Sequence, residues 1–406
     1  MAAEREFDLV LWGASGFTGV LVAEALQRRA SEDGVRWALG GRNEKKLSGV
    51  REAIAAPELP IVIGDGDDAA SLKALAERTR VVCTTVGPYA KYGSKLVAAC
   101  VAAGTDYCDL TGEVHWIRRM IDAHETQARA SGARIVPTCG FDSIPSDLGV
   151  FAVQREMRAR HGAPSAHIQC GVADFRGGMS GGTIASMLDM LETAERDPSI
   201  RRVMANPYSL DPEGRAPGPD GRDALSPQYA EAFAQWTAPF VMAGINTRVV
   251  RRSNALQDDA YGRDFRYEEF MLTGDGPAGA ARAWGIAGGM GVGMGALSVG
   301  PLRRLATRWL PEPGDGPTPE QQERGFWELR FHAAAPDGAP PLCATFRGDR
   351  DPGYGSTSKM LAESALSLAV DPPLVEGGFW TPASGLGEPL FQRLVTHAGL
   401  SFEVDA

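Results

Sequence analysis

The sequence predicts an α/β protein in which a Rossmann domain, a doubly wound parallel sheet covered by helices, precedes a second α+β domain. Short β-branched runs alternate with helical patterns over the first third of the chain, which is typical of βαβ units. After about residue 150 the runs become longer, and loops rich in Pro, Gly and Asp separate them. We therefore expect a Rossmann domain over 1–150, a second α+β domain over 151–350, and a C-terminal helical segment over 351–406 that packs back on the first domain.

The first domain should contain strands and helices in regular alternation. The predicted strands are short apolar runs at Leu9–Trp12, Trp37–Leu39, Pro60–Ile63, Val81–Thr84, Tyr107–Leu110 and Arg134–Pro137. The predicted helices have apolar residues at helical spacing and span Thr18–Arg29, Glu44–Ala55, Ala69–Arg78, Ser94–Ala103 and Glu113–Ala130. Because the strands are parallel, the loops that bind a ligand should lie at one edge of the sheet.

The rest of the chain has longer elements. Strands are expected at His167–Phe175, Phe265–Leu272, Phe326–His332 and Leu342–Arg347, and helices at Thr183–Glu195, Gly355–Val370 and Gly387–Ala398. Two stretches rich in Pro and Gly, Asn206–Gln228 and Pro311–Pro319, predict an irregular surface loop or lid and a connector.

Composition excludes several classes of protein. Hydrophobic residues make up 44% of the 406 residues and charged residues 23%, unlike a polytopic membrane protein or a disordered chain. The formal net charge of −10 gives no general attraction for nucleic acid. The 6 cysteines have neither CxxC nor Cys/His spacing, so no metal site or disulfide framework is predicted. Early acids in place of a basic, then apolar, leader favour a cytoplasmic protein.

The strongest local signal is a GxxGxxG turn directly after the first predicted strand. Its first glycine permits a tight turn, its second lets a pyrophosphate approach the backbone, and its third lets the helix pack closely on the strand. The start of the following helix adds free N–H groups and the positive end of its dipole. The turn predicts a dinucleotide site made by Gly13, Ala14, Ser15, Gly16, Phe17, Thr18 and Gly19.

Residues after the second and third strands indicate which dinucleotide binds. An acid that bonds the adenosine ribose is typical of NAD sites, but this chain has Arg42 and Asn43 at that place. The planar guanidinium of Arg42 suits a 2′-phosphate, so NADP(H) is favoured over NAD. The alternative is that Arg42 is a solvated residue at a helix start. Asp65 should contact the adenine ring, unless it is the N-cap of the next helix.

The loop after the fourth strand should border the nicotinamide half of the cofactor. It comprises Thr85, Val86, Gly87 and Pro88, and Tyr89 follows it. Pro88 stiffens the loop and Gly87 permits close approach. Tyr89 is interpreted either as a proton donor or as an aromatic wall.

Further motifs extend along nearly the whole chain. They are Gly87-Pro88-Tyr89, Gly104–Glu113, Gly140–Asp147, Ser180–Thr183, Asp351–Met360 and Gly377–Ser384. Together with the glycine-rich turn, these motifs resemble those of the saccharopine dehydrogenase-like oxidoreductases, and within them the mycobacterial trans-acting enoyl reductases. The resemblance implies a nicotinamide cofactor and a second domain inserted before the C-terminal helices. The enoyl reductase branch implies reduction of a carbon–carbon double bond in a polyketide or lipid chain made by a separate synthase.

Reduction of an enoyl thioester needs a hydride, a proton for the α-carbon and a hydrogen-bond donor for the enolate oxygen. Hydroxyl groups expected at the cleft are the candidates, and we select Tyr89, Tyr354 and Ser143 as catalytic residues. Each has a structural alternative, such as a packed ring or a turn bond. For Ser143, and for Ser146 or Asp147, that alternative is a place at a helix start. No metal is required.

Segment 283–310 is apolar and glycine-rich, and arginines follow it. No charged residue lies from Ala283 to Leu302, and glycines recur at a spacing that lets helices approach closely. Leu302–Leu310 then places apolar residues on one helical face and arginines mostly off it. A peripheral membrane contact, an acyl-chain site, and a buried helix at a domain or homodimer interface all fit this pattern.

Three functions remain open from the sequence. The first is an NADPH-dependent enoyl reductase that acts on a long, carrier-bound acyl or polyketide chain. The second is an oxidoreductase of the same fold that acts on an imine or amino acid, for which Arg201–Arg202, or Arg248 with Arg251–Arg252, would bind carboxylates. The third is a non-catalytic protein that binds a dinucleotide and associates with lipid.

Overall fold

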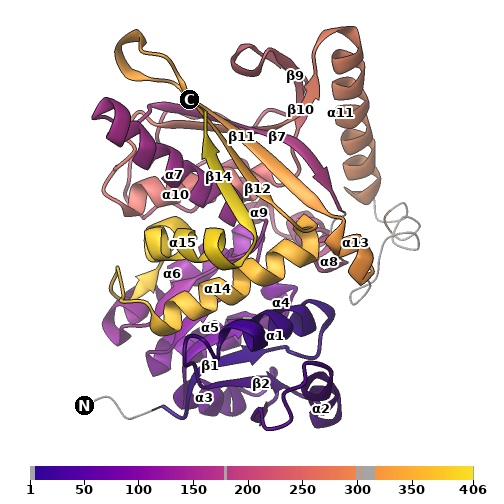
Figure 1. Cartoon of the computed structure of the whole chain (residues 1–406), viewed down its shortest axis with the longest axis vertical. Coiled ribbons are helices and arrows are strands. Elements are labelled where there is room, and N and C mark those ends of the chain that lie inside the picture. The colour runs from indigo at the N-terminus through magenta and orange to yellow at the C-terminus, as the bar shows by residue number, and fades with distance from the viewer. Residues whose placement is uncertain (1–4, 178–180, 299–302, 304–315, 406) are drawn as a thin grey trace.

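The structure is a computed structural model that describes residues 5–177, 181–298, 303 and 316–405. Within these ranges the chain forms two seven-stranded sheets. Helices α14 (Thr357–Val370) and α15 (Gly387–His397) lie between the two sheets (Figure 1). α14 packs on the first sheet and on its helix α1 (Phe17–Arg29), while α15 packs on a strand of the second sheet. The C-terminal segment therefore contacts both halves of the molecule.

The first sheet is parallel throughout. Its strands are β1 (Phe7–Trp12), β2 (Trp37–Gly41), β3 (Ile61–Ile63), β4 (Thr79–Thr84), β5 (Asp106–Cys108), β6 (Arg134–Val136) and β13 (Gly378–Phe379). They lie in the order β13-β6-β5-β4-β1-β2-β3. The strand order reverses between β1 and β4, the place where open α/β sheets bind nucleotides. The sheet confirms the predicted doubly wound fold.

Helices cover both faces of this sheet because alternate side chains of its strands point to opposite sides. In β1, Leu9 and Leu11 enter one core, while Val10 and Trp12 enter the other. α1, α2 and α14 cover the first core, and α3, α5 and α6 cover the second. Besides α1, the helices of this domain are α2 (Glu44–Ala53), α3 (Ala69–Arg78), α4 (Tyr89–Tyr92), α5 (Ser94–Ala103) and α6 (Val114–Ser131).

The second sheet is mixed. Its strands are β7 (His167–Arg176), β8 (Gln228–Ala230), β9 (Gln235–Pro239), β10 (Arg266–Gly274), β11 (Phe326–Ala333), β12 (Leu342–Gly348) and β14 (Leu400–Val404). Their order is β14-β12-β11-β7-β10-β9-β8, and β7 pairs with β10 in parallel while the other pairs are antiparallel. Helix α7 (Ile144–His161) crosses one face, where a Cβ at Gly149 would lie 2.3 Å from the Phe331 ring.

The remaining helices are α8 (Gly181–Arg196), α9 (Pro198–Ala205), α10 (Ala243–Leu256), α11 (Gly276–Ser298) and α13 (Pro319–Glu323). The boundary expected at residue 150 falls within α7, and segment 351–406 adds β13 to the first sheet and β14 to the second. The predicted irregular loop runs from α9 to β8, and Asp220 in it pairs with Arg251 of α10 at 2.7 Å. Residues 311–315 of the predicted connector lie outside the described residues.

Candidate cofactor site and active site

The glycine-rich turn leads directly from β1 into α1. Gly13 has a φ of +88°, a conformation that favours glycine, and a Cβ there would lie 2.5 Å from Cγ2 of Val86. A Cβ at Gly19 would lie only 2.2 Å from the carbonyl oxygen of Gly13. The packing of the protein itself therefore requires glycine at these two positions.

Gly16 has a different environment, which tests whether the turn fits a dinucleotide. A Cβ at Gly16 would meet nothing closer than the Gly13 carbonyl oxygen at 3.5 Å, an ordinary contact. Gly16 is exposed, has extended backbone and precedes α1 as its N-cap, and it supplies no side-chain cap. No contact within the described protein requires glycine at this position. A bound pyrophosphate would require it, because a pyrophosphate binds the N–H groups of a helix start and so touches the backbone here. The turn therefore fits a dinucleotide.

The residues predicted to bind adenosine follow β2 and β3. Arg42 is exposed, and no described residue forms an ion pair with it. Asn43 is the N-cap of α2, and its side chain accepts a backbone hydrogen bond of 3.0 Å from that helix. Asp65 is exposed and accepts a hydrogen bond of 2.9 Å from the N–H of Asp67. The N-cap of α3 is Asp68, so the N-cap alternative for Asp65 is wrong.

The loop Thr85–Pro88 lies against the glycine-rich turn. The Thr85 hydroxyl donates to the Gly13 carbonyl at 3.2 Å, and the Thr85 N–H donates to the Trp12 carbonyl at 3.1 Å. Gly87 is exposed, and the peptide bond from Gly87 to Pro88 is cis. The two loops therefore meet at the carboxyl ends of β1 and β4, the position expected for a dinucleotide site.

Tyr89 lies in the core of the first domain. Its side chain is buried, its hydroxyl donates to the Thr84 carbonyl at 3.2 Å, and it accepts from the Leu110 N–H at 3.4 Å. Its ring packs on Trp116 with centroids 5.5 Å apart. Burial, and then the charge of Asp109, raises the pKa of this phenol well above its usual value. The burial and the bonds of this hydroxyl inside the domain favour the aromatic-wall interpretation, and the role of proton donor stays a prediction.

Glu113 holds the loop after β4 in place. Its carboxylate accepts the first two backbone N–H groups of α4, each at 2.8 Å, and also the hydroxyl of Ser186 from α8 at 2.8 Å. Burial raises the pKa of this carboxyl. Lys91 of α4 and Asp189 of α8 form an ion pair of 2.8 Å between the same two helices. Glu113 is thus a positioning residue that sequence reasoning missed, because its partner Ser186 lies on a distant helix.

Ser143 is fully buried at the start of α7, and its catalytic role stays a prediction. Its hydroxyl donates to Oδ1 of Asn246 at 3.2 Å, and the Asn246 amide donates to Glu269 at 2.8 Å. Ser146 also donates to Glu269, at 3.2 Å. Asp147 accepts a backbone N–H of the C-terminal segment at 2.8 Å. These side chains join α7 to α10 and to the C-terminal segment, and the Ser143 side chain does not cap α7.

Tyr354 lies beside the glycine-rich turn although it is far away in sequence. Its ring meets Phe17 edge to face with centroids 4.8 Å apart, and its hydroxyl accepts from the Gly181 N–H at 3.0 Å. Asp351 accepts the Tyr354 N–H at 2.9 Å and so shapes this turn. Tyr354 thus contacts both the start of α1 and the start of α8. A catalytic role for it stays a prediction.

Asp142 is a carboxyl group that sequence reasoning did not select. It follows β6 at the carboxyl edge of the sheet, and no described residue bonds or pairs with its side chain. A Cβ at Gly112, in the loop after β5, would lie 3.5 Å from its Oδ2. Burial raises the pKa of Asp142 to about 7. The carboxyl can therefore hold a proton near neutral pH and donate it.

The described part of segment 283–310 belongs to α11. This helix packs against β9, β10 and α8, and it stands at one side of the second sheet (Figure 1). The side chains of Trp284 and Val292 are 60% and 75% exposed. Residues 299–302 and 304–310 lie outside the described ranges. Within those ranges, no helix has both the length and the apolar character to cross a bilayer. The membrane, acyl-chain and interface interpretations stay predictions.

The order of the strands, the glycine-rich turn and the loop Thr85–Pro88 are those of a Rossmann domain. Together they define an oxidoreductase that depends on a nicotinamide dinucleotide. The family model described as the saccharopine dehydrogenase NADP binding domain matches residues 9–136. This match covers the first sheet from β1 to β6 and includes the turn and both loops.

Two mycobacterial proteins are similar over nearly the whole chain. A Mycobacterium tuberculosis protein provisionally named as a trans-acting enoyl reductase is 44% identical over 99% of this chain and 98% of its own. A trans-acting enoyl reductase of Mycobacterium ulcerans is 42% identical over 97% of this chain and 96% of its own. The chain belongs to the saccharopine dehydrogenase-like oxidoreductases, in the family of the trans-acting enoyl reductases, which confirms the resemblance in its motifs.

A solved structure shows the same fold at low identity. Apo saccharopine dehydrogenase (L-Glu forming) from Saccharomyces cerevisiae superposes with a TM-score of 0.54 and 11% identity, over 98% of this chain and 99% of that chain. The coverage confirms that both sheets and the returning C-terminal segment belong to one known architecture.

Proposed function

We propose that this protein is an NADPH-dependent enoyl reductase that reduces a carbon–carbon double bond in an acyl thioester of a lipid or polyketide chain. The observation that carries the proposal is the identity of 42–44% to proteins named for this activity, over 97–99% of the chain. The similarity therefore includes the second sheet, where a substrate has to be recognised, as well as the cofactor loops.

The positions of the α10 arginines remove one of the two carboxylate sites that the sequence offered, and leave Arg201–Arg202 as the other. Carboxylates of an amino-acid substrate would need accessible cationic side chains. Arg248 and Arg251 are buried and pair with Asp223 and Asp220 of the loop before β8. Arg252 is buried as well and donates to the Leu210 carbonyl of the same loop, and to the Phe379 carbonyl at 2.7 Å. These three guanidinium groups hold the loop in place, so they are not available to a substrate.

Different residues around the site would bind the cofactor and transfer the proton. NADPH would supply the hydride when bound. The N–H groups at the start of α1 would hold its pyrophosphate, and Arg42 would hold its 2′-phosphate. Glu113 holds the loop that borders the nicotinamide, and Asp142 keeps the proton that the α-carbon receives. Tyr354 packs on Phe17 and closes the turn on the side of the second sheet.

Arg42→Ala should weaken NADPH binding about tenfold and leave NADH binding nearly unchanged, because a charge-assisted contact to the 2′-phosphate contributes roughly 1.5 kcal/mol or more. Titration of cofactor fluorescence measures both affinities. Arg28→Ala removes an exposed arginine from the far end of α1 and serves as the control. Equal losses for the two cofactors in Arg42→Ala would show that Arg42 does not select NADPH.

The activity is tested by NADPH oxidation with enoyl thioesters of rising chain length. We expect turnover that improves with chain length, and none with the matched saturated thioesters. A panel of amino acids with NADP⁺ tests the alternative substrate class. Turnover of amino acids without turnover of any enoyl thioester would reject the proposed function.

A further inference from the structure

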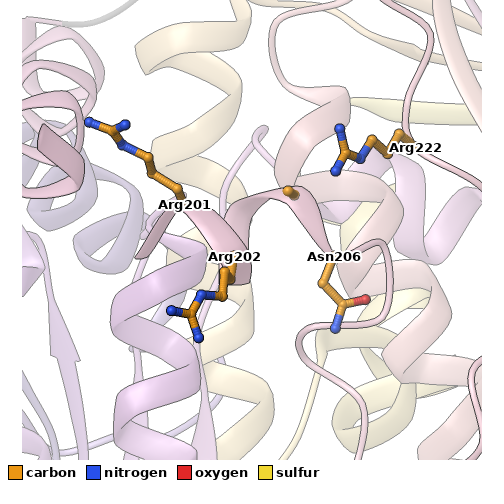
Figure 2. A pocket seen from close by; sticks show the side chains of 5 residues that line it. Arg201, Arg202, Asn206 and Arg222 are labelled. Atoms are coloured by element: carbon orange, nitrogen blue, oxygen red, sulfur yellow. The ribbon is translucent and has the colours of Figure 1, made fainter. Parts of the chain in front are cut away.

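A pocket of about 470 Å³ lies in the second half of the molecule, apart from the residues assigned to the reaction. It is lined by Arg201, Arg202, Ala205, Asn206 and Arg222. In Figure 2 Arg201 and Arg202 extend from α9, and Arg222 reaches toward that helix from the neighbouring loop. The volume is within the range of sites for small molecules.

None of the three arginines forms a direct ion pair with a described residue, although Asp197 lies near enough to Arg202 for their charges to interact. All three are exposed. Arg201 donates its Nε to the Ala194 carbonyl at 2.7 Å, which fixes its stem and leaves the outer nitrogens for a ligand. Asn206 accepts the Tyr208 N–H at 3.0 Å through Oδ1, so its amide group is oriented by the loop. Guanidinium groups so placed are suited to a phosphate oxygen.

The carboxylates nearest in sequence are engaged elsewhere. Asp220 and Asp223, on either side of Arg222, pair with buried arginines of α10. Asp197 caps the start of α9, and its pKa is lowered first by hydrogen bonds from Ser199 and less by the charge of Arg202. Asp220 and Asp223 therefore point toward α10, while Arg222 between them is exposed. The pocket is lined by positive charge on a chain of net charge −10, which suits an anionic ligand.

The pocket is one helix away from the loop that borders the nicotinamide. α9 packs against α6 and α8, the two helices that meet at Glu113 and Ser186. Val203, on the inner side of α9, packs on the apolar cluster that contains Tyr89. The pocket therefore lies on a helix that packs against both helices holding this loop.

We propose that this pocket binds the phosphate group of a phosphopantetheine arm, the carrier to which an acyl thioester is attached. The inference rests on the proposed function, because an acyl thioester presented by a carrier has such a phosphate at the far end of its arm. The same phosphate occurs in coenzyme A and in the arm of a carrier protein. The arginines around the pocket differ in direction (Figure 2), so we expect one or two of them at a time to hold the phosphate and the thioester end to extend toward the active site.

Binding is tested first without any reaction. Phosphopantetheine and pantetheine differ only in the phosphate, so calorimetric titration of the full chain with each isolates its contribution. We expect phosphopantetheine to bind about tenfold more tightly, and Arg202→Ala/Arg222→Ala to remove this difference. The control variant Arg28→Ala/Arg263→Ala loses the same charge at exposed positions outside the pocket. It should keep the difference in affinity between the two probes. Equal binding of both probes by the unaltered protein would overturn the proposal.

Kinetics then distinguish the two sources of the phosphate. The same enoyl chain is presented on coenzyme A, on a carrier protein and on N-acetylcysteamine, which has no phosphate. The double variant should raise KM about tenfold for a phosphate-bearing substrate and leave KM for the N-acetylcysteamine thioester unchanged. An effect limited to the carrier protein assigns the pocket to its arm, and an effect on coenzyme A as well assigns it to either source. An equal effect on all three substrates would overturn the assignment.

The two proposals fail separately. If the unaltered protein reduces no enoyl thioester, N-acetylcysteamine thioesters included, the proposed function fails, while the calorimetric comparison still decides whether the pocket recognises phosphate. If the thioesters are reduced and the phosphate makes no difference, the function stands and the pocket assignment fails.

Discussion

Gly16→Val is expected to fold normally and to lose about 100-fold in affinity for NADPH, which is ~2.7 kcal/mol. The backbone at Gly16 is extended, with φ −78° and ψ 163°, and a Cβ there meets only an ordinary contact at 3.5 Å. Valine therefore fits the protein, and its side chain occupies the space through which the pyrophosphate reaches the helix N–H groups. Fluorescence titration measures the affinity, and thermal unfolding should shift by no more than about 2 °C.

Two matched variants separate binding from folding. Gly19→Ala places a Cβ 2.2 Å from a backbone oxygen, so it should destabilise the first domain by roughly 1–3 kcal/mol and weaken NADPH binding through that strain. Gly49→Ala, on α2 with nothing within 4 Å of its added Cβ, should change neither property. If Gly16→Val bound NADPH like the unaltered protein, the turn would not be the pyrophosphate site.

Asp142→Asn should lower kcat by about 100- to 1000-fold with little change in NADPH binding, the range typical of a lost general acid. No residue in the described part of the chain bonds or pairs with this carboxyl, which lies at the edge of the sheet where the nicotinamide end should lie. Single-turnover oxidation of NADPH in the presence of an enoyl thioester measures the loss. Asp142→Glu keeps an acid at this position and should retain more activity than the asparagine variant.

The proposed role of Asp142 also predicts how kcat changes with pH. Burial raises the pKa of Asp142 to about 7, so the acid form is present below that pH and is lost as pH rises through it. We expect kcat to fall about tenfold for each pH unit above 7 in the unaltered protein, and to stay nearly constant from pH 6 to 8 in Asp142→Asn.

Stability separates a catalytic role for Asp142 from a structural one. The pKa of the folded state is higher than that of the unfolded state, so the burial of Asp142 costs stability increasingly as pH rises between the two values. Asp142→Asn removes this cost, and at pH 8 it should unfold at the same temperature as the unaltered protein or a higher one. A lower unfolding temperature together with a pH profile like that of the unaltered protein would contradict the role of proton donor.

Tyr89 and Ser143, two of the three predicted catalytic residues, lie in the interior of the protein. Tyr89 and Ser143 have hydroxyl groups, and their motifs lie near the expected cleft, so sequence reasoning selected them. Both are buried, and both bond to protein atoms, Tyr89 to the Thr84 carbonyl and Ser143 to Asn246. Asp142, two positions after Gly140 in the same motif, was passed over. Only the folded chain distinguishes a side chain that has a partner from one that has none.

The sequence by itself determined the alternation of strands and helices in the first domain, the glycine-rich turn and the place of Arg42 after the second strand. These features depend on the periodicity of apolar residues and on spacing within a few residues, which act locally. The tertiary structure alone decided which charged side chains are available. The arginines of α10 form ion pairs and hydrogen bonds with a loop some 30 residues away in sequence, whereas the arginines of α9 are exposed. Burial and pairing depend on contacts between distant segments, and no local pattern specifies them.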